Sequence, residues 1–166
     1  MLRALEIRDV LIIDRLSLDL GPGLNVLTGE TGAGKSILVD ALAFVLGERA
    51  DTGLIRSGCD RAEVSAEFDL CDAKSVAGWL REQDIEVEDN SLILRRVLDG
   101  NGRSRAYLNG SAVSVQQLRE VAEGLVDIHG QHAHQSLLRS DAQRALLDSH
   151  ARLSALVQEV AVSWRL

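Results

Sequence analysis

The chain has 166 residues, of which 46% are hydrophobic and 26% charged, and its formal net charge is -7. This length suits one domain with a substantial core and is too short for two ordinary domains. The acidic balance disfavours a freestanding basic surface for DNA or an anionic membrane, but it does not exclude a local basic strip. No apolar run approaches a bilayer span, and acidic residues stand where a secretory signal would be apolar, so we expect a soluble, cytoplasmic protein.

The first third of the chain predicts a β-hairpin, a short strand and a helix. Apolar residues alternate in places from residue 5 to residue 20, and Gly21-Pro22-Gly23 then forces a turn. A strand is expected over 24–28 and a helix over 35–46, with Gly47 as its natural end. A strand, a glycine-rich loop and a helix in succession form half of a βαβ unit, which predicts an α/β fold with its ligand edge at the end of the strand.

The middle of the chain predicts further strands and two helices. Residues 64–70 alternate as a strand, and Asp72 is a plausible cap for a short helix. Residues 91–98 and 103–108 flank two Asx-Gly pairs, which is the clearest hairpin signal in the sequence, and Asn109-Gly110 supplies another turn. A capping box at Ser114 and Gln117 starts a helix that ends at Gly124, and a short buried strand is expected over 125–128.

The last segment, residues 141–166, predicts one continuous helix. It contains no glycine or proline, and Leu146, Leu153 and Val160 recur every seven residues. Ser140 with Gln143 repeats the capping box at its start. The pattern is typical of the base of a coiled coil, and an amphipathic helix that closes the domain is the alternative.

Residues 29–36 carry the strongest chemical signal, because they match the pattern GxxxxGK(S/T) between an expected strand and an expected helix. They are Gly29, Glu30, Thr31, Gly32, Ala33, Gly34, Lys35 and Ser36. In such a loop the backbone N–H groups face the β-phosphate, Lys35 reaches the β- and γ-phosphates, and Ser36 can ligate Mg²⁺. We therefore predict a nucleoside triphosphate site; the alternative is a glycine-rich turn without a ligand.

Phosphate binding is not hydrolysis, which also needs a carboxylate that holds magnesium from an adjacent strand. This Walker B pattern would be an apolar strand that ends in Asp or Asp-Glu, and the sequence does not contain one. The nearest candidate, residues 124–127, has too short an apolar lead and begins with glycine. We therefore expect the site to be incomplete for hydrolysis within this chain.

Further sequence runs accompany the loop over nearly the whole chain. They are LEIRDV from Leu5, LTGETGAGKSI from Leu27, DAL from Asp40, LGERA from Leu46, IRSG from Ile55, GRSRAYLNG from Gly102 and IHGQHAHQ from Ile128. Together they resemble the SMC-like branch of the ABC ATPases. Within that branch, the last two runs resemble a bacterial DNA repair group.

The resemblance implies a P-loop NTPase fold, the N-terminal lobe of an ABC/SMC-type ATPase head with an antiparallel β-layer and the start of a coiled-coil helix. It divides the chain into the lobe, residues 1–140, and the base of the coiled coil, residues 141–166. A separate C-terminal lobe would carry the signature motif and Walker B. ATP and Mg²⁺ would be the cofactors, and two heads would sandwich two ATP molecules. The implied role is recombinational repair of DNA double-strand breaks, on duplex or broken ends, at the nucleoid.

The resemblance also makes Gln131 the Q-loop glutamine, whose amide can coordinate Mg²⁺ and sense the γ-phosphate. Without the family, an ordinary polar loop residue is the better interpretation of an isolated glutamine. His129, His132 and His134 lie beside it, but no cysteine is nearby and the only other histidine is His150. We therefore favour solvent-facing or phosphate-adjacent imidazoles over a zinc site.

Arginines are concentrated in the predicted 91–108 hairpin. They are Arg95, Arg96, Arg103 and Arg105. Alternation places Arg103 and Arg105 on one face, and Arg95 can join them across the turn. Such a strip fits contact with a DNA backbone or a partner head, and a solvated edge protected by charge fits equally well. By resemblance, Arg56 corresponds to the arginine of an SMC-type loop near the nucleotide, with Arg49 as the competing choice.

Two other functions are compatible with a phosphate loop. One is a structural module that binds nucleotide and tethers DNA without significant turnover. The other is a different P-loop enzyme such as a small kinase, but no lid-arginine or acceptor-site pattern supports it. A long heptad region followed by a signature motif and Walker B would select the ATPase head.

Overall fold

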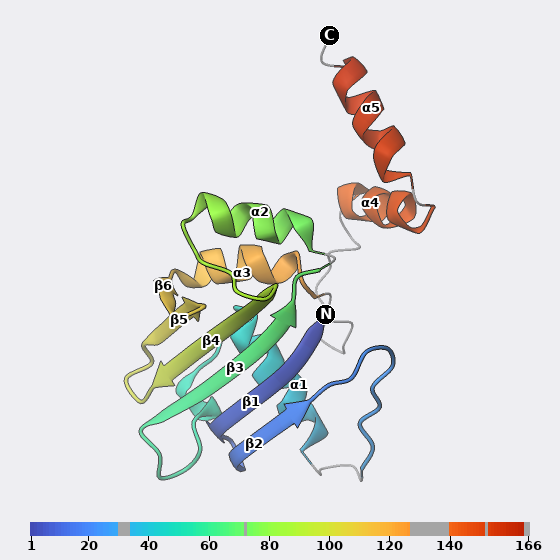
Figure 1. The fold of residues 1–166 in the computed structure, drawn as a ribbon. Helices are drawn as coiled ribbons and strands as arrows, with labels where there is room; N and C mark the ends of the chain where they lie inside the picture. Colours follow the sequence, from blue (N-terminus) through green and yellow to red (C-terminus); the bar gives the residue numbers. More distant parts are fainter. Residues whose placement is uncertain (30–33, 72, 127–139, 152, 165–166) are drawn as a thin grey trace. The chain divides into compact units, whose positions relative to one another are not determined.

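The computed structural model describes residues 1–29, 34–71, 73–126, 140–151 and 153–164. The chain divides into two compact units, Met1–Asp127 and Ile128–Leu166. The first unit contains a six-stranded sheet in the order β2-β1-β3-β4-β5-β6, and every neighbouring pair of strands is antiparallel (Figure 1). The antiparallel β-layer that the resemblance implied is therefore present.

The strands have the following bounds: β1 Leu2–Val10, β2 Ile13–Asp19, β3 Arg61–Asp69, β4 Ser91–Asp99, β5 Ser104–Leu108 and β6 Ser111–Val113. The helices of the first unit are α1 Lys35–Val45, α2 Lys74–Glu82 and α3 Val115–Glu123, with the short 3-10 helix η1 Thr52–Leu54. The hairpins predicted at the start of the chain and around residues 99–102 are confirmed as β1–β2 and β4–β5.

Alternation is strict along β3 and holds over most of β1 and β4, and it separates a buried face of the sheet from a more open one. Side chains such as Val64, Phe68, Leu94 and Leu108 are completely buried on one face, and α1 packs against β1, β3 and β4 on that side while α3 packs against β5. Along β3 the other face carries charged and polar residues at alternate positions from Arg61 to Asp69, as expected for an antiparallel sheet with one face in solvent. The β4 residues on that face include the apolar Ile93 and the buried Val97. The core of the unit therefore lies between the sheet and α1 and α3.

The predicted turns and caps around β5 and α3 are confirmed. Asn109 and Gly110 both have positive φ values, 45° and 84°, which a two-residue turn between β5 and β6 requires. Ser114 and Gln117 form the reciprocal capping box at the start of α3, and Gly124 is its C-cap. For α2 the cap position is Ala73 and no side chain caps it, so the predicted cap at Asp72 is wrong; Asp72 itself lies outside the described residues.

The strand predicted over 24–28 is not formed, which corrects the expected βαβ half-unit. Leu24, Val26 and Leu27 are exposed by 92%, 69% and 53%, and residues 24–29 pair with no strand among the described residues. A strand is stabilised by its neighbours, so an apolar pattern without a partner stays extended and open. The short strand predicted over 125–128 is likewise absent at Leu125 and Val126, which follow the last turn of α3; residues 127 and 128 are outside the described part.

Among its described residues, the second unit holds two helices, α4 Ser140–His150 and α5 Ser154–Trp164, in place of the one continuous helix expected over 141–166. At the end of α4 the backbone N–H of Leu153 donates to the Asp148 carbonyl at 2.9 Å. This hydrogen bond spans five residues, one more than a regular helical bond, and it closes the last turn where α4 ends. Since the closure needs no glycine or proline at the break, the sequence carried no signal for it.

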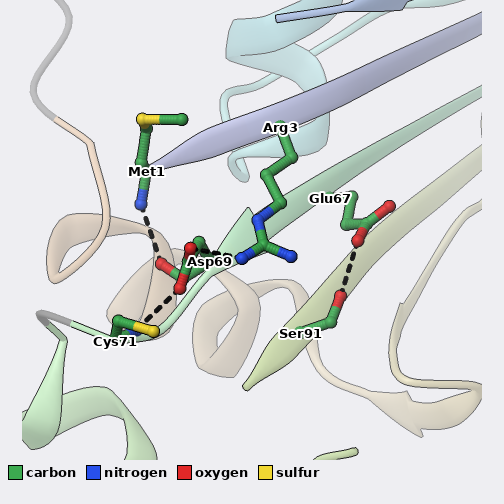
Figure 2. Close-up of polar contacts among 6 residues, drawn as sticks. All are labelled: Met1, Arg3, Glu67, Asp69, Cys71 and Ser91. Carbon is green, nitrogen blue, oxygen red and sulfur yellow. Dashed lines mark hydrogen bonds and ion pairs between the residues drawn. The ribbon is translucent and has the colours of Figure 1, made fainter. Parts of the chain in front are cut away.

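A group of polar contacts ties the end of β3 to the start of β1 (Figure 2). The carboxylate of Asp69 forms an ion pair with Arg3, and it accepts a hydrogen bond from the Cys71 backbone N–H at 2.8 Å. The bonds from Cys71, and then the Arg3 guanidinium, hold the pKa of the Asp69 carboxyl well below its usual range.

Among the described helices, none has the length and apolar character that a membrane span requires.

Candidate nucleotide-binding site

The N-terminus of α1 is arranged as an anion-binding end. Gly34 occupies the N-cap position in the left-handed conformation, with φ 87°, and no side chain caps the helix. Helix α1 also has no acidic residue in its first turn. The first N–H groups of a helix carry partial positive charge and need acceptors, so an uncapped, glycine-led terminus suits a phosphate group.

Lys35 and Ser36 occupy the first turn of this helix. The ammonium Nζ of Lys35 donates a hydrogen bond to the carbonyl of Gly29, the first residue of the predicted loop. Ser36 is exposed, so its hydroxyl is accessible to a ligand. Glu30, Thr31, Gly32 and Ala33 complete the sequence pattern but lie outside the described residues. The described residues of the predicted phosphate loop are Gly29, Gly34, Lys35 and Ser36.

The opposite end of α1 closes in a Schellman motif. The Gly47 N–H donates to the Phe44 carbonyl at 3.1 Å, and the Glu48 N–H donates to the Ala43 carbonyl at 3.0 Å. Gly47 has a φ of +102°, and a Cβ atom there would lie 3.0 Å from the Cβ atom of Arg119. Glycine is therefore required at this position by both backbone conformation and space.

Arg96 is the residue whose role sequence reasoning missed. It is only 4% exposed, and its Nη1 donates to the Phe44 and Glu48 carbonyls at 2.6 Å each. Its Nε donates to Ser104 Oγ at 2.8 Å. Burial, and then the charge of Arg119, lower the pKa of Arg96 to about 10. A signal was present, since Arg96 falls between Leu94 and Leu98 in the inward phase of β4.

Arg119 of α3 approaches the same end of α1. It donates to the Gly47 carbonyl at 3.0 Å and lies 3.8 Å from the Glu48 carboxylate. Two guanidinium groups thus face the carbonyl-rich C-terminus of α1, where the helix dipole favours positive charge.

The arginines predicted to contact DNA or a partner differ in their surroundings. Arg95 forms an ion pair with Glu63 at 2.8 Å and lies over the Tyr107 ring at 5.3 Å; the hydrogen bond to Arg95 lowers the pKa of Glu63. Arg105 is opposite Val97 in the register, which puts it on the same sheet face as Arg95, and it is exposed. Arg103 is also exposed but precedes β5.

Arg56 belongs to a loop held against the first hairpin. Its N–H donates to the Asp9 carbonyl at 2.9 Å, and its guanidinium lies 3.2 Å from the Asp14 carboxylate. The competing residue, Arg49, is exposed. The contacts with Asp9 and Asp14 therefore anchor Arg56 beside the first hairpin.

Gln131, His129, His132 and His134 lie outside the described residues. The described part of the chain contains no cluster of three or more His, Cys, Asp or Glu side chains that could hold a metal ion. Residues 124–127 are the nearest candidate for a Walker B strand, and Leu125 and Val126 of this segment do not form a strand.

Comparison with known proteins identifies the family. The model of the RecF/RecN/SMC N terminal domain matches residues 1–128, and the chain belongs to this family. Its fold is the N-terminal lobe of an ATPase head of the SMC type, as the resemblance implied.

Relatives in several bacteria bear the name DNA repair protein RecN. The protein of Xylella fastidiosa (strain Temecula1 / ATCC 700964) is 44% identical over 168 residues, which cover 99% of this chain and 30% of that protein. That of Haemophilus influenzae is 42% identical over 170 residues, with 99% and 30% covered. That of Bacillus subtilis (strain 168) is 40% identical over 151 residues, with 91% and 26% covered. The chain thus spans about 30% of the length of the curated relatives it matches.

Solved structures support the fold at lower identity. A chain from a study of ATP-driven dimerization and DNA stimulated activation of SMC ATPases aligns with a TM-score of 0.62 at 20% identity, covering 89% of this chain and 97% of that chain. The SMC head domain from Thermotoga maritima aligns with a TM-score of 0.55 at 22% identity, covering 72% and 41%. The recombination mediator RecF aligns with a TM-score of 0.54 at 15% identity, covering 71% and 29%.

Proposed function

We propose that this chain is the ATP-binding lobe of an SMC-like ATPase that acts in recombinational repair of DNA double-strand breaks. The observation that carries the proposal is the N-terminus of α1, which has no side-chain cap, begins within the GxxxxGK(S/T) motif and has Gly34 in the left-handed conformation. The names of the relatives, DNA repair protein RecN, support the repair role.

In this proposal each residue of the loop has a defined task. The backbone N–H groups of residues 29–36 and the dipole of α1 bind the phosphates, and the Lys35 ammonium neutralises the β- and γ-phosphates. Ser36 and Gln131 would hold Mg²⁺, whose charge would offset that of the phosphate oxygens. The exposure of Ser36 and the position of Lys35 Nζ over Gly29 support these assignments.

We propose hydrolysis only in a larger assembly, for two reasons. The sequence contains no Walker B carboxylate or signature motif, and the described segment before the loop exposes Leu24, Val26 and Leu27. Three large apolar side chains exposed within four residues are a feature of surfaces that interact with a partner. We assign that partner to a C-terminal ATPase lobe, and the complete site to two heads that sandwich ATP between them.

The remaining parts of the proposal concern DNA and the second unit. Arg103 and Arg105, which are exposed on and beside β5, would contact DNA phosphates or the partner head, together with Arg95 and, from its own loop, Arg56. Residues 1–140 would form the lobe, and residues 141–166 the base of the coiled coil. The protein would act in the cytoplasm at the nucleoid.

The test is an ATP titration of the wild-type protein and of Lys35→Ala. Loss of this charge-assisted contact should weaken ATP binding about 10- to 100-fold, while the circular dichroism spectrum is unchanged because Lys35 is the first residue of α1 and lies outside the buried core. Lys74→Ala, which removes the other lysine of the sequence at the start of α2, is the matched control and should bind like the wild type. Undiminished affinity of Lys35→Ala would overturn the assignment.

A further inference from the structure

The guanidinium of Arg96 is shared between two parts of the molecule. On one side it donates to the Phe44 and Glu48 carbonyls, at and just beyond the end of α1. On the other side it donates to Ser104 Oγ, and Ser104 is the first residue of β5. The same guanidinium lies 4.5 Å from the centre of the Phe44 ring. One buried side chain on β4 therefore fastens the end of α1 to the β4–β5 hairpin.

From these contacts we propose that Arg96 is a positioning residue of the nucleotide site: it fixes the C-terminal end of α1 on the sheet and thereby sets the place of Gly34, Lys35 and Ser36 at the other end. The inference rests on the proposed function, because it assigns a role in phosphate binding. Among the described residues, the hydrogen bonds of Arg96 go to Phe44, Glu48 and Ser104 and not to Gly34, Lys35 or Ser36.

The physical reason is the stiffness of a short helix. Helix α1 has 11 residues, so about 15 Å separates its ends, and a displacement or tilt at one end is carried to the other. At the N-terminal end the described residues show no side-chain cap that would hold Gly34 in place. The hydrogen bonds to the C-terminal carbonyls are therefore the better-defined anchor of the helix.

Arginine suits this position better than any other residue. Its planar guanidinium donates in several fixed directions at once, whereas a lysine ammonium is a compact charge on a flexible stem. The groups that face it are consistent with this role. Backbone carbonyls and the Ser104 hydroxyl accept its hydrogen bonds. The charge of Arg119 lowers its pKa, and the charge of Glu48 raises it. Arg119 donates a hydrogen bond to the neighbouring Gly47 carbonyl, but Arg119 belongs to α3 and not to the sheet.

The experiment compares Arg96→Met, Arg96→Lys and Leu92→Ala with the wild type in the protein at its natural length. Leu92 is fully buried on the same face of β4, four residues before Arg96, and its truncation lowers stability without touching the carbonyls of α1. Two quantities are measured well below the unfolding temperature: the dissociation constant of Mg-ATP, and the amide chemical shifts of Gly34 and Lys35 without nucleotide.

We expect Arg96→Met to raise the dissociation constant at least about fivefold and to shift both amide resonances, with a smaller rise in Arg96→Lys. Leu92→Ala should unfold at a lower temperature yet bind ATP within about twofold of the wild type. Equal binding by the two Arg96 variants and the wild type, or an equal loss in Leu92→Ala, would overturn the role. If Arg96→Met does not fold, Arg96→Lys decides between these results.

The design separates this inference from the proposed function. A wild-type protein that shows no Lys35-dependent ATP binding refutes the proposed function alone, because the amide shifts still report whether Arg96 positions the start of α1. Normal wild-type binding with unchanged amide shifts in the Arg96 variants refutes the positioning role alone.

Discussion

Gly47 gives the sharpest stability prediction, because its backbone angle and its nearest neighbours are both known. The residue has a φ of +102°, and an added Cβ atom would lie 3.0 Å from Arg119 Cβ and 3.2 Å from Arg119 Cα. An L-residue at positive φ costs about 1–2 kcal/mol, and forcing a methyl group into a filled site costs roughly 1–3 kcal/mol more. Gly47→Ala should therefore destabilise the first unit by about 2–5 kcal/mol.

The assay is thermal unfolding followed by circular dichroism, with two glycine controls. For a chain of this size the loss corresponds to a fall of about 5–15 °C in the melting temperature. Gly58 also has a positive φ, +86°, but an added Cβ would meet nothing within 4 Å, so Gly58→Ala should show only the backbone cost. Gly21→Ala, which has neither constraint, should be near neutral. If the Gly47→Ala protein is no less stable than the Gly58→Ala protein, the close packing of Gly47 against Arg119 is refuted.

Two further predictions concern charge. Replacing Arg103 and Arg105 with Glu should weaken DNA binding and reduce the slope of log affinity against log salt by about 2, whereas the same change at Arg61, at the start of β3, should leave the slope within error; an unaltered slope in the double variant favours a plain charged edge. Asp69 has a depressed pKa in the folded state, so its contribution to stability is present above the unfolded pKa near 3.9 and is lost as the pH falls further. Asp69→Asn should therefore destabilise the protein at pH 7 and by progressively less as the pH falls below about 4, and a loss of stability that does not shrink in acid, or that Asp19→Asn reproduces, contradicts the assignment.

Local signals in the sequence predicted most of the sheet and its helices. The Asx-Gly pairs fixed the β4–β5 and β5–β6 turns, and the Ser114 capping box fixed the start of α3, because each of these structures depends on residues within a few positions of each other. Alternation also predicted β3. The phosphate loop was recognised for the same reason, since its chemistry is contained in eight consecutive residues.

Features that depend on distant partners were predicted less well. The segment 24–28 has the pattern of a strand but lacks a described strand to pair with, so its periodicity alone was misleading. The break between α4 and α5 is closed by a backbone hydrogen bond that any residue can make. Arg96 was grouped with the surface arginines of the hairpin, although its inward phase in β4 pointed to the core; that it holds the end of α1 depends on a contact with residues about fifty positions away.

Steady-state ATP hydrolysis tests the central claim most directly, namely that this chain binds ATP but cannot complete the catalytic site. We predict that the purified chain alone turns over almost no ATP, that addition of the C-terminal lobe restores turnover, and that the rate per molecule rises with protein concentration because two heads form the site. Lys35→Ala should abolish the restored activity. Robust, Lys35-dependent hydrolysis by the chain alone as a monomer would contradict the claim, because it would show that a full site exists within these residues.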